Sequence, residues 1–154
     1  MKWTRFIIAI LICQMAGIIG SLATFSAITD WYVKLQSPSF TPPNWLFGPV
    51  WLTLYTLMGI SLFWIWEKDL KKNKKALYIF GTQLFLNALW SFLFFGFHLL
   101  FYSLIEITLL WITIVLTIFS FLKISRKAGL ILIPYIAWVS IALTLNYYIW
   151  ILNP

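Results

Sequence analysis

Apolar residues fall into five long runs, and short polar or charged segments separate them. A bilayer core about 30 Å thick needs roughly 20 apolar residues in an α-helix, because each residue adds about 1.5 Å. Each run reaches that length, and none alternates like a strand of an outer-membrane barrel. The pattern therefore predicts transmembrane helices over residues 6–28, 45–66, 76–97, 99–122 and 130–152.

Composition supports the same fold class. Of 154 residues, 62% are apolar and only 10% are charged, so a water-facing surface cannot be built. The connections between the runs are too short for a soluble module. We predict an all-α integral membrane protein, a five-transmembrane-helix bundle that forms one domain over residues 1–154.

The first run has an alternative interpretation as a signal peptide. Lys2 and Arg5 precede it, and Ser21-Leu22-Ala23 resembles a small-residue cleavage site. Against this, the apolar run continues to Ile28, and small residues recur along it in the way that close helix packing in lipid requires. A retained helix is favoured.

Charge predicts the orientation. Every Lys and Arg except Lys34 falls at the N-terminus or in the second or fourth loop. The positive-inside rule places these segments, and the N-terminus, in the cytoplasm and the C-terminus outside. The run from Lys68 to Lys75 would attract anionic headgroups. Nucleic acid is not an expected partner, because the charges sit in short loops beside the membrane.

The first loop, residues 29–44, is the longest connection. Pro38, Pro42 and Pro43 stiffen it, so we expect an ordered Pro-rich cap. Helical rise places Trp51 roughly 9 Å and Trp90 roughly 10 Å below the outer surface. Polar and indole side chains thus crowd the outer half of the bundle, which predicts a cavity beneath this loop.

Helical spacing predicts the faces that point inward. These are Trp51, Tyr55 and Met58; Gln83, Asn87, Trp90 and Phe94; and Trp138, Ala142 and Leu145, with Asn146 beside the last group. Asn87 and Asn146 either join helices by hydrogen bonds or contact a ligand. The deep indoles Trp51, Trp90 and Trp138 form either an aromatic box for a flat apolar ligand, which is favoured, or plain packing.

Three other polar residues have ordinary interpretations. Glu106 is deep and lacks a basic partner, so a neutral, hydrogen-bonded structural role is favoured over a proton relay. His98 is expected in a loop at the membrane boundary, outside the cavity. Cys13 is the single cysteine. No metal site and no required cofactor are expected.

Conventional catalysis has no signal in the sequence, since no nucleophile–base pair or phosphate-binding glycine loop is present. Coupled transport is also disfavoured. Five helices do not divide into inverted halves, and no helix is expected to carry a Gly/Pro break.

A known family shares the most distinctive segments. The chain resembles the translocator protein family, also called the tryptophan-rich sensory proteins or peripheral-type benzodiazepine receptors. The resemblance spans nearly the whole chain, with compact loops typical of a bacterial member. It rests on Trp31-Tyr32, Leu35-Gln36, Pro38-Ser39, Pro42-Pro43, Trp45, Gly48-Pro49-Val50-Trp51, Leu54-Tyr55, Met58-Gly59, Gln83-Leu84, Leu86-Asn87, Trp90, Phe94-Phe95-Gly96, Pro134-Tyr135, Ala137-Trp138, Ala142, Thr144-Leu145-Asn146-Tyr147 and Trp150.

The resemblance implies a membrane receptor, often a homodimer, that binds porphyrins such as protoporphyrin IX and benzodiazepine-type apolar ligands under the first loop. Two alternatives stay open: light-dependent porphyrin degradation, with Trp51 and Trp138 as candidate catalytic residues, and transport of porphyrin or another lipophile. The porphyrin would be ligand or substrate rather than cofactor. The implied ligand-binding residues are Tyr32, Pro42, Trp51, Tyr55, Asn87, Trp90, Trp138 and Ala142.

Overall fold

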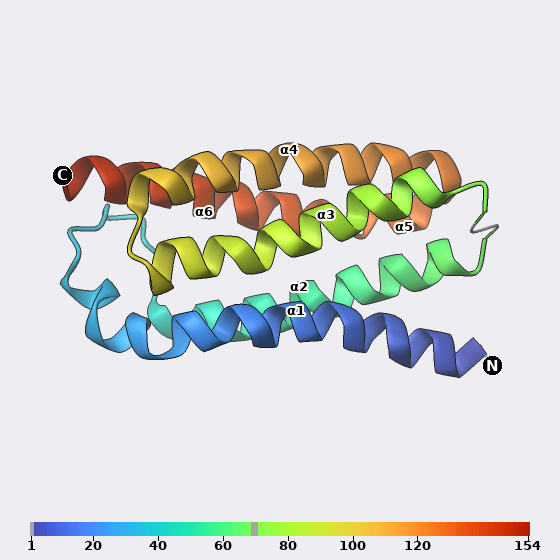
Figure 1. The fold of residues 1–154 in the computed structure, drawn as a ribbon, viewed down its shortest axis with the longest axis horizontal. Coiled ribbons are helices and arrows are strands. Elements are labelled where there is room, and N and C mark those ends of the chain that lie inside the picture. The colour runs from blue at the N-terminus through green and yellow to red at the C-terminus, as the bar shows by residue number, and fades with distance from the viewer. Residues whose placement is uncertain (1, 69–70) are drawn as a thin grey trace.

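The computed structural model describes residues 2–68 and 71–154, and every regular element within them is helical. Three short elements extend or connect the long helices: a 3-10 turn η1 (Tyr32–Lys34), a π-helical turn η2 (Phe92–Gly96) and α5 (Arg126–Leu130). The helices lie side by side along the long axis, and the two termini lie at opposite ends (Figure 1). The long helices are α1 (Lys2–Asp30), α2 (Asn44–Trp66), α3 (Lys74–Ser91), α4 (Leu100–Ile124) and α6 (Ile133–Leu152).

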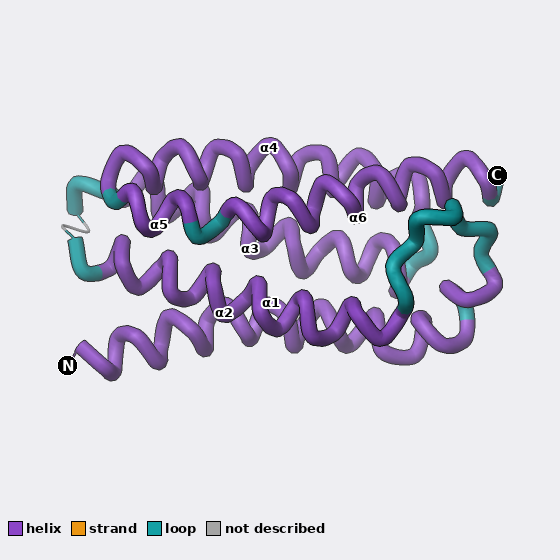
Figure 2. Tube along the Cα trace, turned by 180° about the vertical axis from the view of Figure 1, so that it is seen from behind, coloured by secondary structure: helices purple, strands orange, loops and turns teal. Residues whose placement is uncertain are grey.

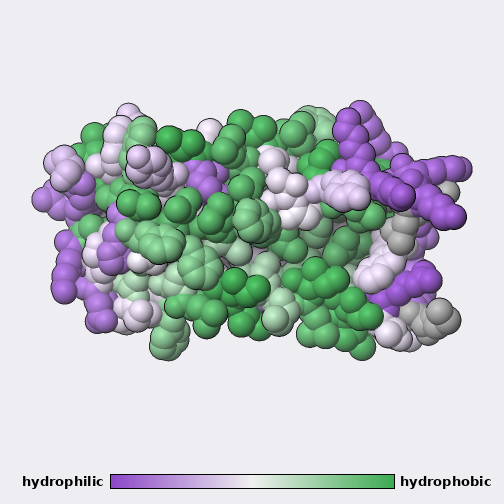
Figure 3. Space-filling view, in the orientation of Figure 1, coloured by the Kyte–Doolittle hydropathy of each residue, from purple (hydrophilic) through white to green (hydrophobic). Residues whose placement is uncertain are grey.

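Within residues 2–68 and 71–154, five helical stretches are long and apolar enough to cross a membrane. Hydrophobic side chains cover the middle of the molecule, and hydrophilic side chains gather at its two ends (Figure 3). The predicted five-helix integral membrane bundle is confirmed. The stretches are Lys2–Asp30, Asn44–Trp66, Lys74–Gly96, Leu100–Ile124 and Arg126–Leu152.

Most helices extend beyond the predicted apolar runs. α1 begins at Lys2 rather than residue 6 and ends at Asp30 rather than residue 28. The reason is that hydropathy marks only the hydrocarbon-embedded part of a helix. Polar residues at the interface continue the same backbone hydrogen bonding.

The last membrane span is interrupted, and the expectation of unbroken helices is wrong here. α5 ends at Leu130, a turn over residues 131–132 follows, and α6 begins at Ile133. Pro134 at the start of α6 has no N–H for the Leu130 carbonyl, so a continuous helix would lose that hydrogen bond. Helix α2 stabilises the interrupted segment, because Ser61 Oγ donates a hydrogen bond to the Ala128 carbonyl of α5 over 2.7 Å.

The first loop is ordered and fixed to the end of α6. The Gln36 N–H donates to Asn153 Oδ1 over 3.0 Å, and Asn153 Nδ2 donates to the Gln36 carbonyl over 2.9 Å. Phe40 packs edge-on against Tyr148 with ring centroids 5.6 Å apart. The loop therefore covers one end of the bundle beside the C-terminus (Figure 2).

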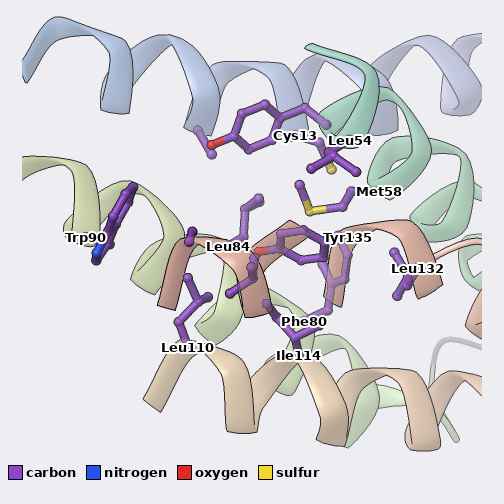
Figure 4. Close-up of a cluster of buried hydrophobic side chains, with 14 of the residues drawn as sticks. Cys13, Leu54, Met58, Phe80, Leu84, Trp90, Leu110, Ile114, Leu132 and Tyr135 are labelled. Atoms are coloured by element: carbon purple, nitrogen blue, oxygen red, sulfur yellow. The ribbon is translucent and has the colours of Figure 1, made fainter. Parts of the chain in front are cut away.

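The core lies along the bundle axis. Cys13 of α1, Met58 of α2, Phe80 of α3, Ile114 of α4 and Tyr135 of α6 are all buried and converge there (Figure 4). The predicted inward face of the third membrane span is confirmed, since its polar and aromatic members are nearly inaccessible: Gln83 (1% exposed), Asn87 (2%) and Trp90 (7%) of α3, and Phe94 (2%) of η2.

Basic residues gather at the end that holds the N-terminus. They come from the start of α1, the connection between α2 and α3, and the junction of α4 with α5. Arg5 and Glu67 form an ion pair there, with Nη1 and Oε1 3.3 Å apart. Asp69 and Leu70, inside the predicted lysine-rich run, lie outside the described residues.

Helices α1 and α2 approach each other closely at Gly59. A Cβ built on Gly59 would lie 2.6 Å from the Ile10 Cα and 3.1 Å from the Ala9 carbonyl oxygen. Both are backbone atoms, which cannot move aside as a flexible side chain can. Glycine at residue 59 therefore permits the approach that small residues give in lipid.

We expect Gly59→Ala to destabilise the protein by about 1–3 kcal/mol, because the added methyl group overpacks the contact. Equilibrium unfolding in mixed micelles would measure the change. Gly81→Ala is the matched control: a Cβ at Gly81 meets nothing within 4 Å, and alanine favours helix. Equal stability of wild type and Gly59→Ala would contradict the packing argument.

Candidate ligand-binding cleft

Small residues let α1 pack first against α2 and then, further along the helix, against α3 and η2. A Cβ on Gly17 would lie 2.5 Å from the Tyr55 ring of α2. One turn further, a Cβ on Gly20 would lie 3.1 Å from Ser91 Oγ of α3, and one on Gly96 of η2 would lie 3.4 Å from the Ala23 methyl group. The C-terminal half of α1 therefore packs on α3 and η2, and a cleft opens between α1 and α2.

The cleft has a volume of about 660 Å³ and extends along α1 from Gln14 to Asp30, beside the first loop. Its rim residues Ile18, Phe25 and Leu52 are 54%, 87% and 63% exposed. All three belong to helical stretches that are apolar enough to cross a membrane, so the cleft opens toward lipid. The lining residues are Gln14, Gly17, Ile18, Gly20, Ser21, Thr24, Phe25, Ser26, Ile28, Thr29 and Asp30 of α1, Phe47, Gly48, Trp51, Leu52 and Tyr55 of α2, and Trp90, Ser91 and Phe95 of α3 and η2.

Aromatic rings form the inner wall of the cleft. Trp51 stacks on Tyr55, with centroids 5.6 Å apart and planes at 28°. Trp90 meets Phe95 edge to face at 5.8 Å. Three predicted ligand-binding residues, Trp51, Tyr55 and Trp90, thus line one cavity.

A buried hydrogen-bond network lies directly behind this wall. The Tyr55 hydroxyl donates to Asn87 Oδ1, and Asn87 Nδ2 donates to the Tyr135 hydroxyl over 2.8 Å. Tyr135 in turn donates to Gln83 Oε1 over 2.8 Å. Both ends of the Asn87 amide are occupied by α2 and α6, so in this conformation it joins helices and does not line the cleft.

Asn146 also joins helices. Its Oδ1 accepts from Trp90 Nε1 over 3.0 Å, and its Nδ2 donates to the Leu100 carbonyl over 3.0 Å. The indole of Trp90 is therefore held at its N–H while part of its ring faces the cleft. For both Asn87 and Asn146, the structure favours interhelical hydrogen bonding over contact with a ligand.

Three further predicted site residues lie elsewhere among the described residues. Tyr32 is buried above the cleft and packs 5.7 Å from Phe95, and burial raises the pKa of its hydroxyl. Pro42 is half-buried in the loop before α2, and Ala142 is buried on α6. None of these three lines the cleft as described.

Trp138 lines a second cavity. A groove of about 490 Å³ runs between α2 and α6, lined by Pro49, Val50, Thr53, Leu54, Leu57, Pro134, Ala137, Trp138 and Ile141. The two tryptophans that the sequence assigns to one pocket are thus divided between two cavities. Phe47 lies between them, because it lines the cleft and packs edge-on against Trp138 at 5.8 Å.

The predicted role of Glu106 is wrong, whereas the predicted position of His98 in a loop is confirmed. Both Glu106 carboxyl oxygens are buried without a hydrogen-bond partner in the described chain, so the hydrogen-bonded role predicted for it is wrong. The surrounding α4 positions Ile107 and Leu110 are apolar and offer no donor side chain. His98 lies in the turn before α4, as predicted, and stacks on Trp31 at 4.0 Å. No cluster of metal-ligating side chains occurs among residues 2–68 and 71–154.

Three residues that line the cleft are not predicted from the sequence: Ser21, Thr24 and Phe47. Phe47 is one aromatic residue among many at a helix start. Ser21 and Thr24 belong to the run of small residues that indicates close helix packing, although hydroxyl residues on an otherwise apolar face also indicate a polar cavity edge.

Comparisons with known proteins agree with this architecture. The sequence model described as the TspO/MBR family matches residues 9–151. "Tryptophan-rich protein TspO" of Archaeoglobus fulgidus is 40% identical over 153 residues, 99% of each chain. "Translocator protein" of Homo sapiens is 37% identical over 135 residues, covering 86% of this chain and 80% of the relative. "Tryptophan-rich sensory protein" of Cereibacter sphaeroides is 29% identical over 147 residues, 96% and 90% of the two chains.

Replacing Asn87 tests the network behind the aromatic wall. We expect Asn87→Leu to lower the free energy of unfolding by about 1–3 kcal/mol, because the Tyr55 and Tyr135 hydroxyls lose their shared partner in a dry environment. Unfolding in mixed micelles provides the measurement. Thr82→Val on the same helix is the control, since Thr82 is exposed and bonds only within α3. A variant as stable as wild type would rule out a structural role for the amide.

Proposed function

This chain belongs to the TspO/MBR family of membrane proteins, and we propose that it is a receptor for porphyrins, protoporphyrin IX in particular, and for benzodiazepine-type apolar ligands. A binding or regulatory role in the membrane is supported by the family as a whole. The observation that carries the specific proposal is the aromatic cleft between α1 and α2. Its volume of about 660 Å³ falls within the range of small-molecule sites.

The cleft matches a flat apolar ligand. The Trp51–Tyr55 stack and the Trp90 ring supply π-faces on one side, and stacking on such rings favours planar molecules. Gln14 and Ser21 on α1 offer hydrogen bonds to polar groups at the ligand edge. Gln14 Nε2 already donates to Thr56 Oγ1 over 3.0 Å, so its carbonyl oxygen is positioned by α2.

Trp51 also favours a second candidate function, light-dependent porphyrin oxidation by dioxygen. An excited porphyrin in the cleft would lie against the indole, which can donate an electron. Tyr55 stacks on the same indole. The reduced porphyrin would pass its extra electron to dioxygen, giving superoxide, and the oxidised indole would then take an electron from the porphyrin. The porphyrin radical cation and superoxide would combine, so that one porphyrin and one dioxygen give one oxygenated porphyrin and the indole is restored. The cleft would hold the reactive product beside these rings.

One titration tests the receptor. We expect protoporphyrin IX to quench tryptophan fluorescence saturably in darkness when added to the protein in nanodiscs. Trp51→Phe should weaken binding about 2- to 10-fold, because it reduces the stacking surface. Trp45→Phe is the control, since Trp45 is 72% exposed and outside the cleft. Without saturable quenching in the wild type, the receptor proposal fails.

Illumination of the same samples separates receptor from enzyme. Oxidation would appear as a change in the porphyrin absorbance that is lost in Trp51→Phe at saturating ligand. Conversion at an unchanged rate in that variant would exclude Trp51 as the electron donor. A spectrum that is stable under light leaves the receptor function alone.

We further propose that the basic end of the bundle is cytoplasmic, because all its loops carry Lys or Arg while the other end has only Lys34. In a Cys13→Ala background, Ser37→Cys should react with a membrane-impermeant maleimide added to intact cells. Lys75→Cys should react only after the membrane is permeabilised. Both positions are exposed, so a reversed labelling pattern would reverse the orientation.

A further inference from the structure

A single phenyl ring lies between the cleft and Trp138. Phe47, in the first turns of α2, lines the cleft and packs edge-on against Trp138, with centroids 5.8 Å apart and planes at 72°. It also meets Tyr32 edge-on at 6.2 Å, directly under the first loop. The rings that would otherwise form one aromatic pocket are therefore divided at Phe47.

Trp138 carries an unsatisfied hydrogen-bond donor. Its indole Nε1 is buried and has no acceptor within the described chain. Buried donors in native proteins nearly always have a partner, and an orphaned one is unfavourable. The groove cannot supply the missing acceptor, because the burial of Nε1 shows that this atom does not face the open space of the groove.

Little packing holds the Phe47 ring in its present rotamer. Its side chain is only half-buried, and the open volume of the cleft lies on one side of it. The next residue, Gly48, has no neighbouring atom within 4 Å of a built Cβ. Pro49 removes one backbone hydrogen bond from the same turn. Little close packing opposes a change of its rotamer.

We propose that Phe47 is a movable partition that determines which ligands reach Trp138. A ligand entering the cleft displaces the phenyl ring, joins the cleft to the Trp138 side and places a hydrogen-bond acceptor against the indole N–H. The preferred ligand is a planar apolar molecule with an acceptor at its edge, such as a carboxylate or carbonyl oxygen. This inference rests on the proposed receptor function and names the group that selects the ligand.

A double-mutant cycle with protoporphyrin IX tests the partition. Phe47→Ala should tighten binding several-fold, because no ring has to be displaced. Trp138→Phe, which removes only the N–H donor and part of the ring, should weaken binding about 2- to 10-fold in both the wild-type and the Phe47→Ala backgrounds. Phe25→Ala is the matched control: it removes a phenyl group from the rim of the same cleft, is 87% exposed, and should not tighten binding.

Two results of the cycle would overturn the partition. Weaker binding in Phe47→Ala would make Phe47 a fixed wall that contributes contacts. Unchanged binding in Trp138→Phe, in both backgrounds, would show that the ligand never reaches the indole. Thermal unfolding of each variant checks that an altered affinity does not arise from misfolding.

A ligand-independent measurement separates this inference from the receptor proposal. With 4-fluorophenylalanine at position 47, the ¹⁹F spectrum of the ligand-free protein should show two exchanging environments. Saturating protoporphyrin IX should leave only the displaced one. If the wild type does not bind porphyrin, the receptor proposal fails, and the partition is judged on the ligand-free spectrum. A single sharp resonance there would overturn the partition.

Discussion

The arrangement of this bundle depends on one hydrogen-bonded chain across its dry centre. Tyr55 of α2, Asn87 and Gln83 of α3 and Tyr135 of α6 satisfy one another where neither water nor lipid can. Gln83 Nε2 also donates to Met58 Sδ of α2 over 3.8 Å. Because the groups of this network depend on one another for their hydrogen bonds, the rotation of all three helices about their axes is fixed together. Trp51, one turn from Tyr55, and Trp90, three residues from Asn87, are thereby turned toward the cleft. The ligand wall is a by-product of the need to bury amides and hydroxyls.

Helix α1 contributes differently, through the absence of side chains. It touches α2 at Gly59, then touches α3 and η2 through Gly20 and Ala23. Larger residues at positions 20, 23 and 59 would hold α1 away from both neighbours, and no defined cleft would form between α1 and α2. The first loop is held by its contacts with Asn153 at the end of α6, so the end of the cavity beside this loop is bounded by a fixed segment.

Hydropathy and helical spacing predicted the helix number and most of the buried faces, because both depend on local periodicity in a medium that strongly penalises exposed polar groups. They did not predict that Trp51 and Trp138 would line separate cavities. That division depends on the position of Phe47 and on the packing of α2 and α6. Periodicity along one helix specifies neither of them. The break before α6 was readable from Pro134, whereas the isolation of Glu106 depends on what neighbouring helices happen to present.

The exposed rim at Ile18, Phe25 and Leu52 has a consequence for how occupancy is controlled. A ligand that arrives through this opening comes from the hydrocarbon phase, so the concentration that governs binding is its mole fraction in lipid. The membrane acts as a reservoir that enriches lipophiles and depletes polar molecules before the protein contributes any selectivity. Apparent affinity then varies with the amount of lipid in the sample, and two membranes of different composition would fill the same cleft to different extents at one aqueous dose.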